Sequence, residues 1–256
     1  MHFTILTPTF NSQKTIIKTI QSIKKQTFKN FNCIFIDSNS IDKTIRIIKK
    51  NIYKKKIISE KDNGIYDALN KGIKNSKDSK NSIISVLHSN DIFYSKNTLS
   101  IVAEGFKYNN VNVVFGDLIY TNKNGKTLRY WKSFKKKPSK ILTAADFKKI
   151  LHYGWMPAHP AVFIKKSFIN KLDKYNLKYD ISADYDYLVK LFKKKNLRAL
   201  YIDKKLVSME WGGKSNRIKN IFRKMSQDLS IIKINKIGGI KTLIYKNISK
   251  IHQFFN

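Results

Sequence analysis

Residues 2–37 read HFTILTPTFNSQKTIIKTIQSIKKQTFKNFNCIFID, two apolar segments separated by an amphipathic one. The segments HFTILTP and FNCIFID have the length and composition of buried strands. Between them, Ile16, Ile20 and Ile23 recur at the spacing of one helical face. A strand, a helix and a second apolar strand in this order indicate a parallel pair covered by helices. This stretch therefore predicts an α/β protein.

The same alternation continues to about residue 120. FNCIFID is followed by Ile41, Ile45 and Ile48, KKIISEKD by Ile65, Leu69 and Ile73, and NSIISVLH by a helix over 97–109 that leads into VNVVFGD. We therefore expect a mostly parallel central sheet flanked by helices. Ligands bind beyond the carboxyl ends of such strands, and these ends carry the polar turns TPTFN, DSNSID, EKDNG and HSND.

After residue 120 the pattern changes. YTNKNGKTLRYW predicts a hairpin that turns at Asn124 and Gly125. Further helices are expected near 140–151, within DISADYDYLVKLFKKKN and from about 217 to the end, and HPAVFIKKSFI is expected to be a strand that leads into a helix.

Composition limits the function classes. The 256 residues are 42% hydrophobic, which is enough for a substantial core. There is no uncharged apolar run of about 18 residues, and the start lacks the pattern of a signal peptide, so we expect a cytoplasmic location. The only cysteine, Cys33, lies in an apolar run and is expected in the core.

The net charge of +34 arises from lysines spread along the whole chain. Because no nucleic-acid-binding motif accompanies them, the sequence disfavours nucleic acid as a partner. A nucleoside diphosphate or an anionic membrane surface would benefit equally from a positive field.

Nucleotide-binding glycine motifs are absent from the sequence. Neither Gly-x-Gly-x-x-Gly nor Gly-x-x-x-x-Gly-Lys-Ser/Thr occurs, so a dinucleotide fold and a phosphate-loop ATPase are both disfavoured. A site without a glycine loop can neutralise a diphosphate with a divalent cation held by carboxylates. Asp91, expected at the end of the fourth strand, is a candidate for this carboxylate.

At this level the chain resembles the family 2 glycosyltransferases of bacterial polysaccharide synthesis, which have the fold called GT-A. The resemblance rests on six segments in the family's order: residues 7–44, IISEKDNGIYDALNKGI, LHSNDIFY, HPAVFIKKSFI, SADYDYLVKL and KNISKIHQFF. It implies a nucleotide-sugar-binding half over 1–120, an acceptor-binding and catalytic-base half over 121–215, and a helical segment over 216–256.

The resemblance also assigns residues to the nucleotide sugar. It implies that the turn of Pro8, Thr9, Phe10 and Asn11 lies against the nucleotide, that Asp37 hydrogen-bonds the uracil, and that Asp62 and Gly64 belong to the same pocket. For Asp37 the alternative is that the carboxylate caps the turn that follows it. For Gly64 the alternative is a purely conformational role.

The family's next motif is usually Asn-Ser-Asp-Asp, and here it reads His88, Ser89, Asn90, Asp91. The resemblance implies that Asn90 faces the ribose with an amide in place of a carboxylate, and that Asp91 holds Mn²⁺ or Mg²⁺ against the diphosphate. A degenerate, inactive relative is the competing interpretation.

Inverting transfer needs a base that takes the proton of the acceptor hydroxyl. The resemblance places it in ADYD and makes Asp184 the candidate. Asp186 is expected to cap or support the helix, and Asp180 to lie in a loop.

Three further residues are candidates for acceptor binding. His159 could contact the acceptor or the diphosphate, with a structural role as the alternative. Trp155 and Trp211 could form a wall on which a sugar stacks, with core packing as the alternative. WGGKSN, residues 211–216, resembles a family loop that closes over the site, and a tight turn is the alternative.

Together these features predict an inverting, metal-dependent hexosyl- or N-acetylhexosaminyl-transferase that uses a nucleotide sugar, with UDP-sugar favoured. The acceptor would be a saccharide or a lipid-linked sugar in capsule, lipopolysaccharide or exopolysaccharide synthesis. The last helix has Ile240, Leu243, Ile244, Ile248 and Ile251 beside Lys241, Lys246 and Lys250. It is expected to lie on the inner membrane face, with its lysines facing the lipid headgroups, or to pack on the domain. The rival function is a non-catalytic nucleotide-sugar-binding or polyanion-binding protein.

Overall fold

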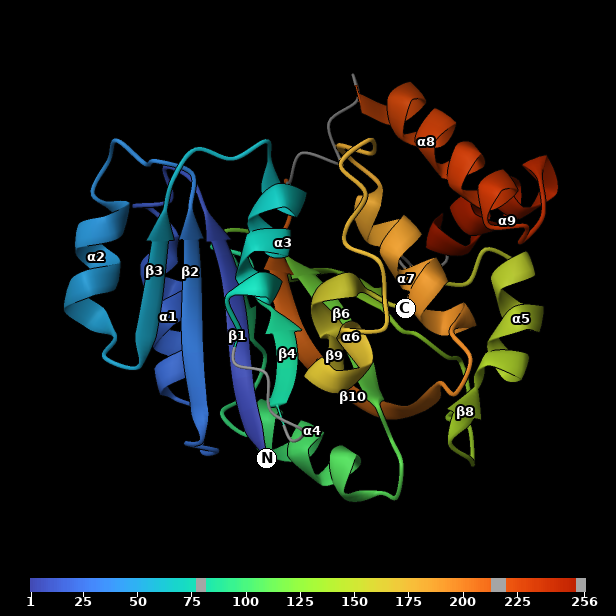
Figure 1. The fold of residues 1–256 in the computed structure, drawn as a ribbon, viewed down its shortest axis with the longest axis horizontal. Coiled ribbons are helices and arrows are strands. Elements are labelled where there is room, and N and C mark those ends of the chain that lie inside the picture. Colours follow the sequence, from blue (N-terminus) through green and yellow to red (C-terminus); the bar gives the residue numbers. More distant parts are fainter. Residues whose placement is uncertain (77–81, 213–219, 252–256) are drawn as a thin grey trace.

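The computed structural model describes residues 1–76, 82–212 and 220–251 (Figure 1). Its first part confirms the predicted alternation, except that the helix after the second strand begins at Thr44, so that Ile41 precedes it and is 92% exposed. The elements are β1 (His2–Thr9), α1 (Ile16–Lys24), β2 (Phe31–Asp37), α2 (Thr44–Asn51), β3 (Lys55–Ser59), α3 (Ile65–Lys74), β4 (Ser82–Val86), β5 (Asp91–Phe93), α4 (Thr98–Lys107) and β6 (Val113–Thr121).

The second part contains the predicted hairpin and helices. The hairpin turns at Gly125, whose φ of +81° lies in the region that glycine adopts without strain. The elements are β7 (Thr127–Trp131), β8 (Leu142–Thr143), α5 (Ala144–His152), the 3₁₀ turn η1 (His159–Ala161), β9 (Val162–Lys165), α6 (Lys166–Ile169), α7 (Ala183–Lys193), β10 (Arg198–Glu210), α8 (Ile221–Ile234) and α9 (Ile240–Ile251).

These strands form one ten-stranded sheet in the order β3-β2-β1-β4-β9-β6-β10-β5, with β7 on β6 and β8 on β10. β1 pairs in parallel with β2 and β4, and β6 pairs in parallel with β10. β9 is antiparallel to both of its neighbours, β4 and β6. The strands β3, β2, β1, β4, β6 and β10 therefore run in the same direction, and their carboxyl ends lie at one edge.

Alternate residues of the central strands enter two separate cores, because successive side chains of a strand point to opposite faces. Ile34 and Leu6 belong to the core under α3, α5 and α7. Phe35, Ile5 and Cys33 belong to the core under α1, α2 and α4, which confirms the predicted burial of the cysteine. Figure 1 shows α8 and α9 at the end of the molecule opposite α2, next to α7.

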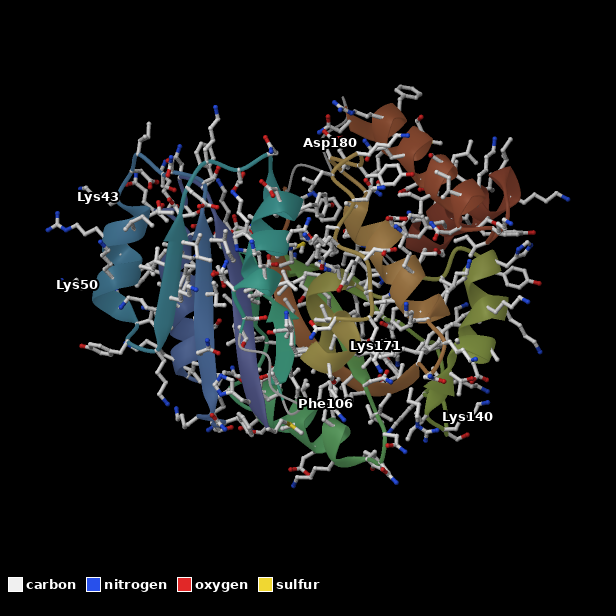
Figure 2. All side chains as sticks on the ribbon, in the orientation of Figure 1. Lys43, Lys50, Phe106, Lys140, Lys171 and Asp180 are labelled. Carbon is white, nitrogen blue, oxygen red and sulfur yellow. The ribbon has the colours of Figure 1, made fainter. Side chains whose placement is uncertain are left out.

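Cationic side chains are distributed around the molecule. Figure 2 shows Lys43 and Lys50 extending from one end and Lys140 and Lys171 lying in the opposite half. The lysines that the structure describes therefore do not form one concentrated basic patch, which is what a general bias of the composition towards lysine would produce. In the ranges 1–76, 82–212 and 220–251, no helix combines the length and apolar character needed to cross a membrane.

Candidate active site

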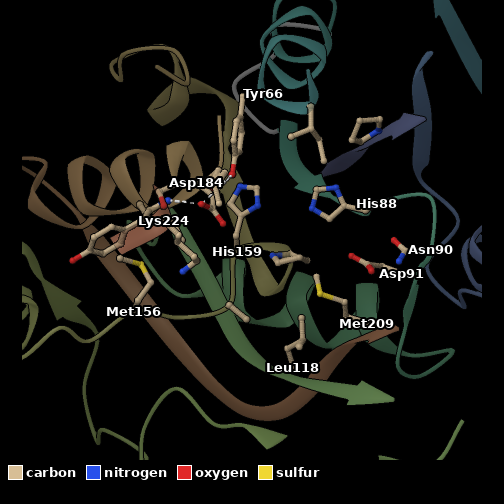
Figure 3. Close-up of a pocket in the computed structure, with 18 of the residues that line it drawn as sticks. Tyr66, His88, Asn90, Asp91, Leu118, Met156, His159, Asp184, Met209 and Lys224 are labelled. Carbon is tan, nitrogen blue, oxygen red and sulfur yellow. Dashed lines mark hydrogen bonds between the residues drawn. The ribbon is translucent and has the colours of Figure 1, made fainter. Parts of the chain in front are cut away.

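A pocket of about 700 Å³ lies at the edge where the same-direction strands end (Figure 3). Its lining includes Pro8 near the end of β1, Ser38 after β2, His88 after β4, and Tyr120 and Met209 near the ends of β6 and β10. The segment that follows β3 and the beginning of α7 also line it. The polar turns that the sequence placed at the carboxyl ends therefore do meet in one cavity.

The turn after β4 holds the candidate metal ligand. Asp91 donates its backbone N–H to the carbonyl of His88 at 3.0 Å, and the hydroxyl of Thr19 donates to the carbonyl of Asp91 at 2.8 Å. Ser89 is tied to Ser12 through hydroxyl oxygens 2.9 Å apart. Asp91 begins β5 rather than ending β4, and contacts with α1 and with the turn that follows β1 hold this turn in place.

The carboxylate of Asp91 is completely buried, and within the described parts of the chain neither of its oxygens has a hydrogen-bond partner. Desolvation raises the pKa of Asp91 well above its usual range. Buried polar groups are nearly always paired, because the loss of hydration is otherwise uncompensated. The orphaned oxygens line the pocket and fit a divalent cation, for which carboxylate oxygen is a preferred ligand. Asn90, one residue earlier, is exposed and also lines the pocket.

On the nucleotide side, the structure brings together most of the predicted residues. Pro8, Thr9, Phe10, Asp62 and Gly64 all line the pocket. The ring of Phe10 is 62% exposed, and Asp62 accepts a hydrogen bond from the N–H of Gly64 at 2.9 Å. Gly64 has a φ of +105° at the start of α3, a conformation that favours glycine.

Asp37 and Asn11 are not in the pocket lining. The buried carboxylate of Asp37 accepts hydrogen bonds from the hydroxyls of Thr9 and Ser59, and from both the N–H and the hydroxyl of Ser40. Asn11 accepts the N–H of Ile41. Both side chains fasten the turn after β2, and Ser38 of that turn lines the pocket.

Asp184 lies in the first turn of α7, as predicted. Its Oδ1 accepts the N–H of Tyr185 at 2.8 Å and lies 3.2 Å from the hydroxyl of Tyr66, which also donates to the carbonyl of Ile181 at 2.7 Å. Among the described residues no hydrogen bond reaches Oδ2 of Asp184. Figure 3 shows Asp184 and Asp91 on opposite sides of the pocket, with His159 and His88 between them.

Among the described residues, His159 and His88 are the two imidazoles that line this pocket, with ring centroids 6.3 Å apart. Nε2 of His159 lies 2.7 Å from the hydroxyl of Tyr175, whose ring stacks on Tyr187 at 4.1 Å. Burial lowers the pKa of both histidines, that of His88 to about 3, with the neighbouring His159 as a smaller cause. Both rings are therefore neutral at physiological pH.

The other two predicted aspartates have the expected supporting roles. Asp186 is buried, pairs with Lys190 at 2.8 Å and accepts the amide of Asn235 at 3.0 Å. Asp180 lies in the loop before α7 and accepts the amide of Gln227 at 2.6 Å. Both therefore connect α7 and its preceding loop to the α8 region.

Neither predicted tryptophan lines the pocket. Trp155 lies among Phe115, Phe134, Phe147 and Phe192, and its indole N–H donates to a backbone carbonyl. Trp155 is therefore partly buried against the core, as the core-packing alternative describes. Trp211 is 38% exposed and packs edge-on against Tyr120, with the two ring centroids 5.2 Å apart. The rest of the predicted loop, residues 213–216, lies outside the described residues.

The hairpin supplies pocket residues that the sequence analysis missed. Arg129 is 7% exposed, and its guanidinium carbon lies 5.2 Å from the ring centroids of both Tyr120 and Trp131. All three line the pocket. The alternation of Arg129 and Trp131 in TLRYW was the available signal, because residues two apart on a strand share a face.

The C-terminal helices supply another wall that was missed. Lys224, Asp228 and Lys246 line the pocket, and Lys246 pairs with Asp228 at 2.7 Å. Its Nζ lies 3.2 Å above the ring of Tyr185, and burial lowers the pKa of Lys246 to about 8. Lys246 therefore points into the domain, which corrects its predicted position against lipid headgroups, and the neighbouring Leu243 is also buried.

A glycine explains how α9 comes so close. Gly154 has a φ of +69°, and a Cβ on it would lie 2.6 Å from the backbone of Lys246. Any side chain at this position would push α9 away from the pocket.

A mixed α/β sheet with a carboxylate-bearing pocket at the carboxyl ends of its strands is the architecture of a GT-A glycosyltransferase. The chain belongs to glycosyl transferase family 2, whose family model matches residues 4–172. The match ends before α7, so Asp184 lies beyond the matched segment.

Similar proteins agree with this assignment. A PGL/p-HBAD biosynthesis glycosyltransferase of Mycobacterium bovis is 28% identical over 222 residues, 84% of this chain and 80% of the relative. Among solved structures, TarS of S. aureus is 20% identical with a TM-score of 0.69, over 91% of this chain and 40% of the TarS chain. The mannosyltransferase PcManGT of Pyrobaculum calidifontis, solved with GDP-Man and Mn²⁺, is 13% identical with a TM-score of 0.64, over 96% of this chain and 68% of PcManGT. At these identities the structural matches establish the fold alone.

Proposed function

We propose that this glycosyltransferase is an inverting, metal-dependent enzyme that moves a hexosyl or N-acetylhexosaminyl group from a UDP-sugar to a saccharide or lipid-linked acceptor in surface-polysaccharide synthesis. One observation carries the proposal: a single pocket holds an unpaired, buried carboxylate, Asp91, on one side and a second carboxylate, Asp184, on the other. Structures of TarS in complex with UDP and with UDP-GlcNAc support a UDP-sugar donor.

On the donor side, Asp91 would hold the cation, and Pro8, Thr9, Phe10 and Asp62 would surround the nucleotide. A bound divalent cation would supply Lewis-acid stabilisation of the charge on the departing diphosphate. The Mn²⁺ in the PcManGT structure supports a cation in this fold. Asn90, exposed at the rim, would hydrogen-bond ribose hydroxyls through its amide.

On the acceptor side, Asp184 is the proposed base. The acceptor oxygen forms a bond to the anomeric carbon while the bond from that carbon to the diphosphate oxygen breaks, and the nucleotide leaves with the electron pair. The hydroxyl proton passes to Oδ2 of Asp184, which the described residues leave without a hydrogen bond. The hydrogen bonds of Tyr66 and Tyr185 to Oδ1 keep the carboxylate oriented during this transfer.

Two variants separate this function from a non-catalytic sugar-nucleotide-binding protein. Asp184→Asn preserves the shape of the side chain but removes its basicity, so we expect turnover to fall by about 10²–10⁴-fold while UDP affinity stays within about twofold. Asp186→Asn is the matched control, because it removes a neighbouring carboxylate that is bound to Lys190 and Asn235 instead. Unchanged turnover in Asp184→Asn would refute the assignment of the base.

We also propose that α8 and α9 rest on the anionic inner face of the membrane. Ile240, Ile244 and Ile248 recur every four residues on α9 and are 62%, 48% and 48% exposed, and Phe222 on α8 is 85% exposed. Exposed lysines such as Lys241 lie beside them. Apolar side chains beside cations are the pattern of a helix that lies at a lipid interface.

Vesicle co-sedimentation tests this surface. The protein should bind anionic vesicles at low salt and release them at high salt, and Ile244→Asp should weaken binding without lowering the unfolding temperature. Equal binding to neutral vesicles, or no effect of the substitution, would contradict the proposal.

A further inference from the structure

His88 and Asp91 stand at the two ends of one tight turn. The hydrogen bond from the N–H of Asp91 to the carbonyl of His88, 3.0 Å long, closes a four-residue turn, in which the first and last Cα atoms lie within about 7 Å of each other. Thr19 anchors its end and Ser12 its middle, through the hydrogen bonds described above. The two side chains therefore leave the backbone at neighbouring, fixed positions.

Both side chains carry buried polar atoms without a partner. Over the described ranges, Nδ1 of His88 and both carboxylate oxygens of Asp91 make no hydrogen bond, not even to each other. Both residues line the pocket, and Figure 3 shows the imidazole and the carboxylate on the same side of it. Unpaired buried atoms from the two ends of one tight turn indicate one ligand that contacts both.

The chemistry of these atoms identifies that ligand. A neutral imidazole nitrogen and a carboxylate oxygen are both ligands of divalent transition metals. Asn90 provides only an amide, so Asp91 is the single carboxylate of the turn. A second ligand from the same turn would supply the donor atom that the amide of Asn90 replaces less well, without adding charge.

We propose that His88, through Nδ1, and Asp91 together hold the divalent cation, and that this pair favours Mn²⁺ over Mg²⁺. The inference rests on the proposed function, because the cation is the one that accompanies the nucleotide diphosphate. Imidazole suits transition metals, whereas Mg²⁺ prefers oxygen ligands alone. His159 is not part of the pair, since its Nε2 is bound to Tyr175.

The test is electron-spin-echo spectroscopy of Mn²⁺ bound to the full chain with UDP, which detects nitrogen coordinated to the metal. We expect nitrogen modulation in the wild type and its loss in His88→Asn, where asparagine suits the turn but lacks the imidazole. The dissociation constant for Mn²⁺ in the presence of UDP should rise by about tenfold or more, and that for Mg²⁺ should change much less. His159→Gln, which removes the other imidazole of the pocket, is the matched control and should keep the modulation.

The outcomes separate this inference from the function on which it rests. If the wild type binds Mn²⁺ and UDP together without nitrogen modulation, His88 is not a ligand and the proposed function stands. Nitrogen modulation that survives in His88→Asn, or that disappears only in His159→Gln, also overturns the inference. The same holds if His88→Asn binds UDP more weakly but keeps the Mn²⁺ spectrum and affinity of the wild type. If the wild type binds neither Mn²⁺ nor UDP, both proposals fail. The wild-type spectrum decides the question even where the variant does not fold.

Discussion

Replacing Asp91 with Asn should stabilise the metal-free protein and abolish its response to ligands. The carboxylate is completely buried without a hydrogen-bond partner among the described residues, and desolvation raises its pKa well above the usual range. The unfolded chain has an ordinary pKa near 3.8 at this position. Folding therefore becomes less favourable as the pH rises from about 4 towards the folded-state pKa, because the folded carboxyl retains its proton.

The amide has the same shape and is equally unpaired, but it carries no charge at any pH. The metal-free variant should therefore gain, at pH 8, about 1.4 kcal/mol for each pKa unit by which folding raises the carboxyl pKa up to that pH. For a domain of this size the melting temperature should rise by about 2–4 °C per kcal/mol. At pH 4 the gain should nearly vanish, since wild-type Asp91 is then mostly protonated when folded and about half protonated when unfolded.

Ligands should reverse this order. With UDP and Mn²⁺ at about 100 times their dissociation constant, the wild type gains about 2.7 kcal/mol by mass action, and the variant should gain almost nothing. The assay is thermal unfolding in EDTA, and in Mn²⁺ with UDP, at pH 4 and pH 8. Asp173→Asn, at an exposed position, is the control and should match the wild type. A variant less stable than the wild type in EDTA at pH 8, or one with a full ligand-induced shift, would refute the reasoning.

Three further substitutions test the structure away from Asp91. Asp146→Asn at the start of α5 removes the charge, but not the acceptor oxygen, of a capping box, and it should lower the free energy of unfolding by about 1 kcal/mol in chemical denaturation at pH 7. Since Lys140 and Thr143 lower the pKa of Asp146 to about 2, this difference should fade between about pH 4 and pH 2, and a constant difference would contradict the assignment. Trp155→Ala should lower the free energy of unfolding by about 3–5 kcal/mol and leave the UDP affinity of the folded fraction unchanged. A loss of UDP affinity without a loss of stability would instead indicate that Trp155 contacts the ligand. Lys246→Met should lower the free energy of unfolding by about 3–5 kcal/mol, because it leaves Asp228 without its closest cation. The double variant Lys246→Met/Asp228→Leu should regain much of this stability, and no regain would show that the broken ion pair is not the cause.

Much of the fold could be predicted from local pattern. Ile16, Ile20 and Ile23 show the helical period beside apolar strands, and a parallel sheet follows from that alternation. The position of β9 could not be predicted, because its pairing with β4 and β6 depends on segments about 50–80 residues away, for which the pattern gives no register.

The residues of the candidate site likewise fall into those that the sequence could place and those that it could not. Asp91, Gly64 and Phe10 could be placed because they stand in turns at the carboxyl ends of strands, which meet at one edge. Trp155 and Trp131 could not be told apart, since both are aromatic residues in apolar surroundings. Only the packing of four phenylalanines distant in sequence shows that Trp155, which is partly buried, lies against the core. Lys246 was misjudged for a related reason: its partner Asp228 lies on another helix.

The approach of α9 to Gly154 has a practical consequence for anyone who divides this chain into modules. The family match ends at residue 172, yet Lys246 and Asp228 close the pocket from the last two helices. An expression boundary or chimera junction drawn at the end of the match would remove both the proposed base and this wall. When acceptor preference is exchanged between relatives, α7 to α9 should therefore be transferred as one block, with glycine retained at position 154.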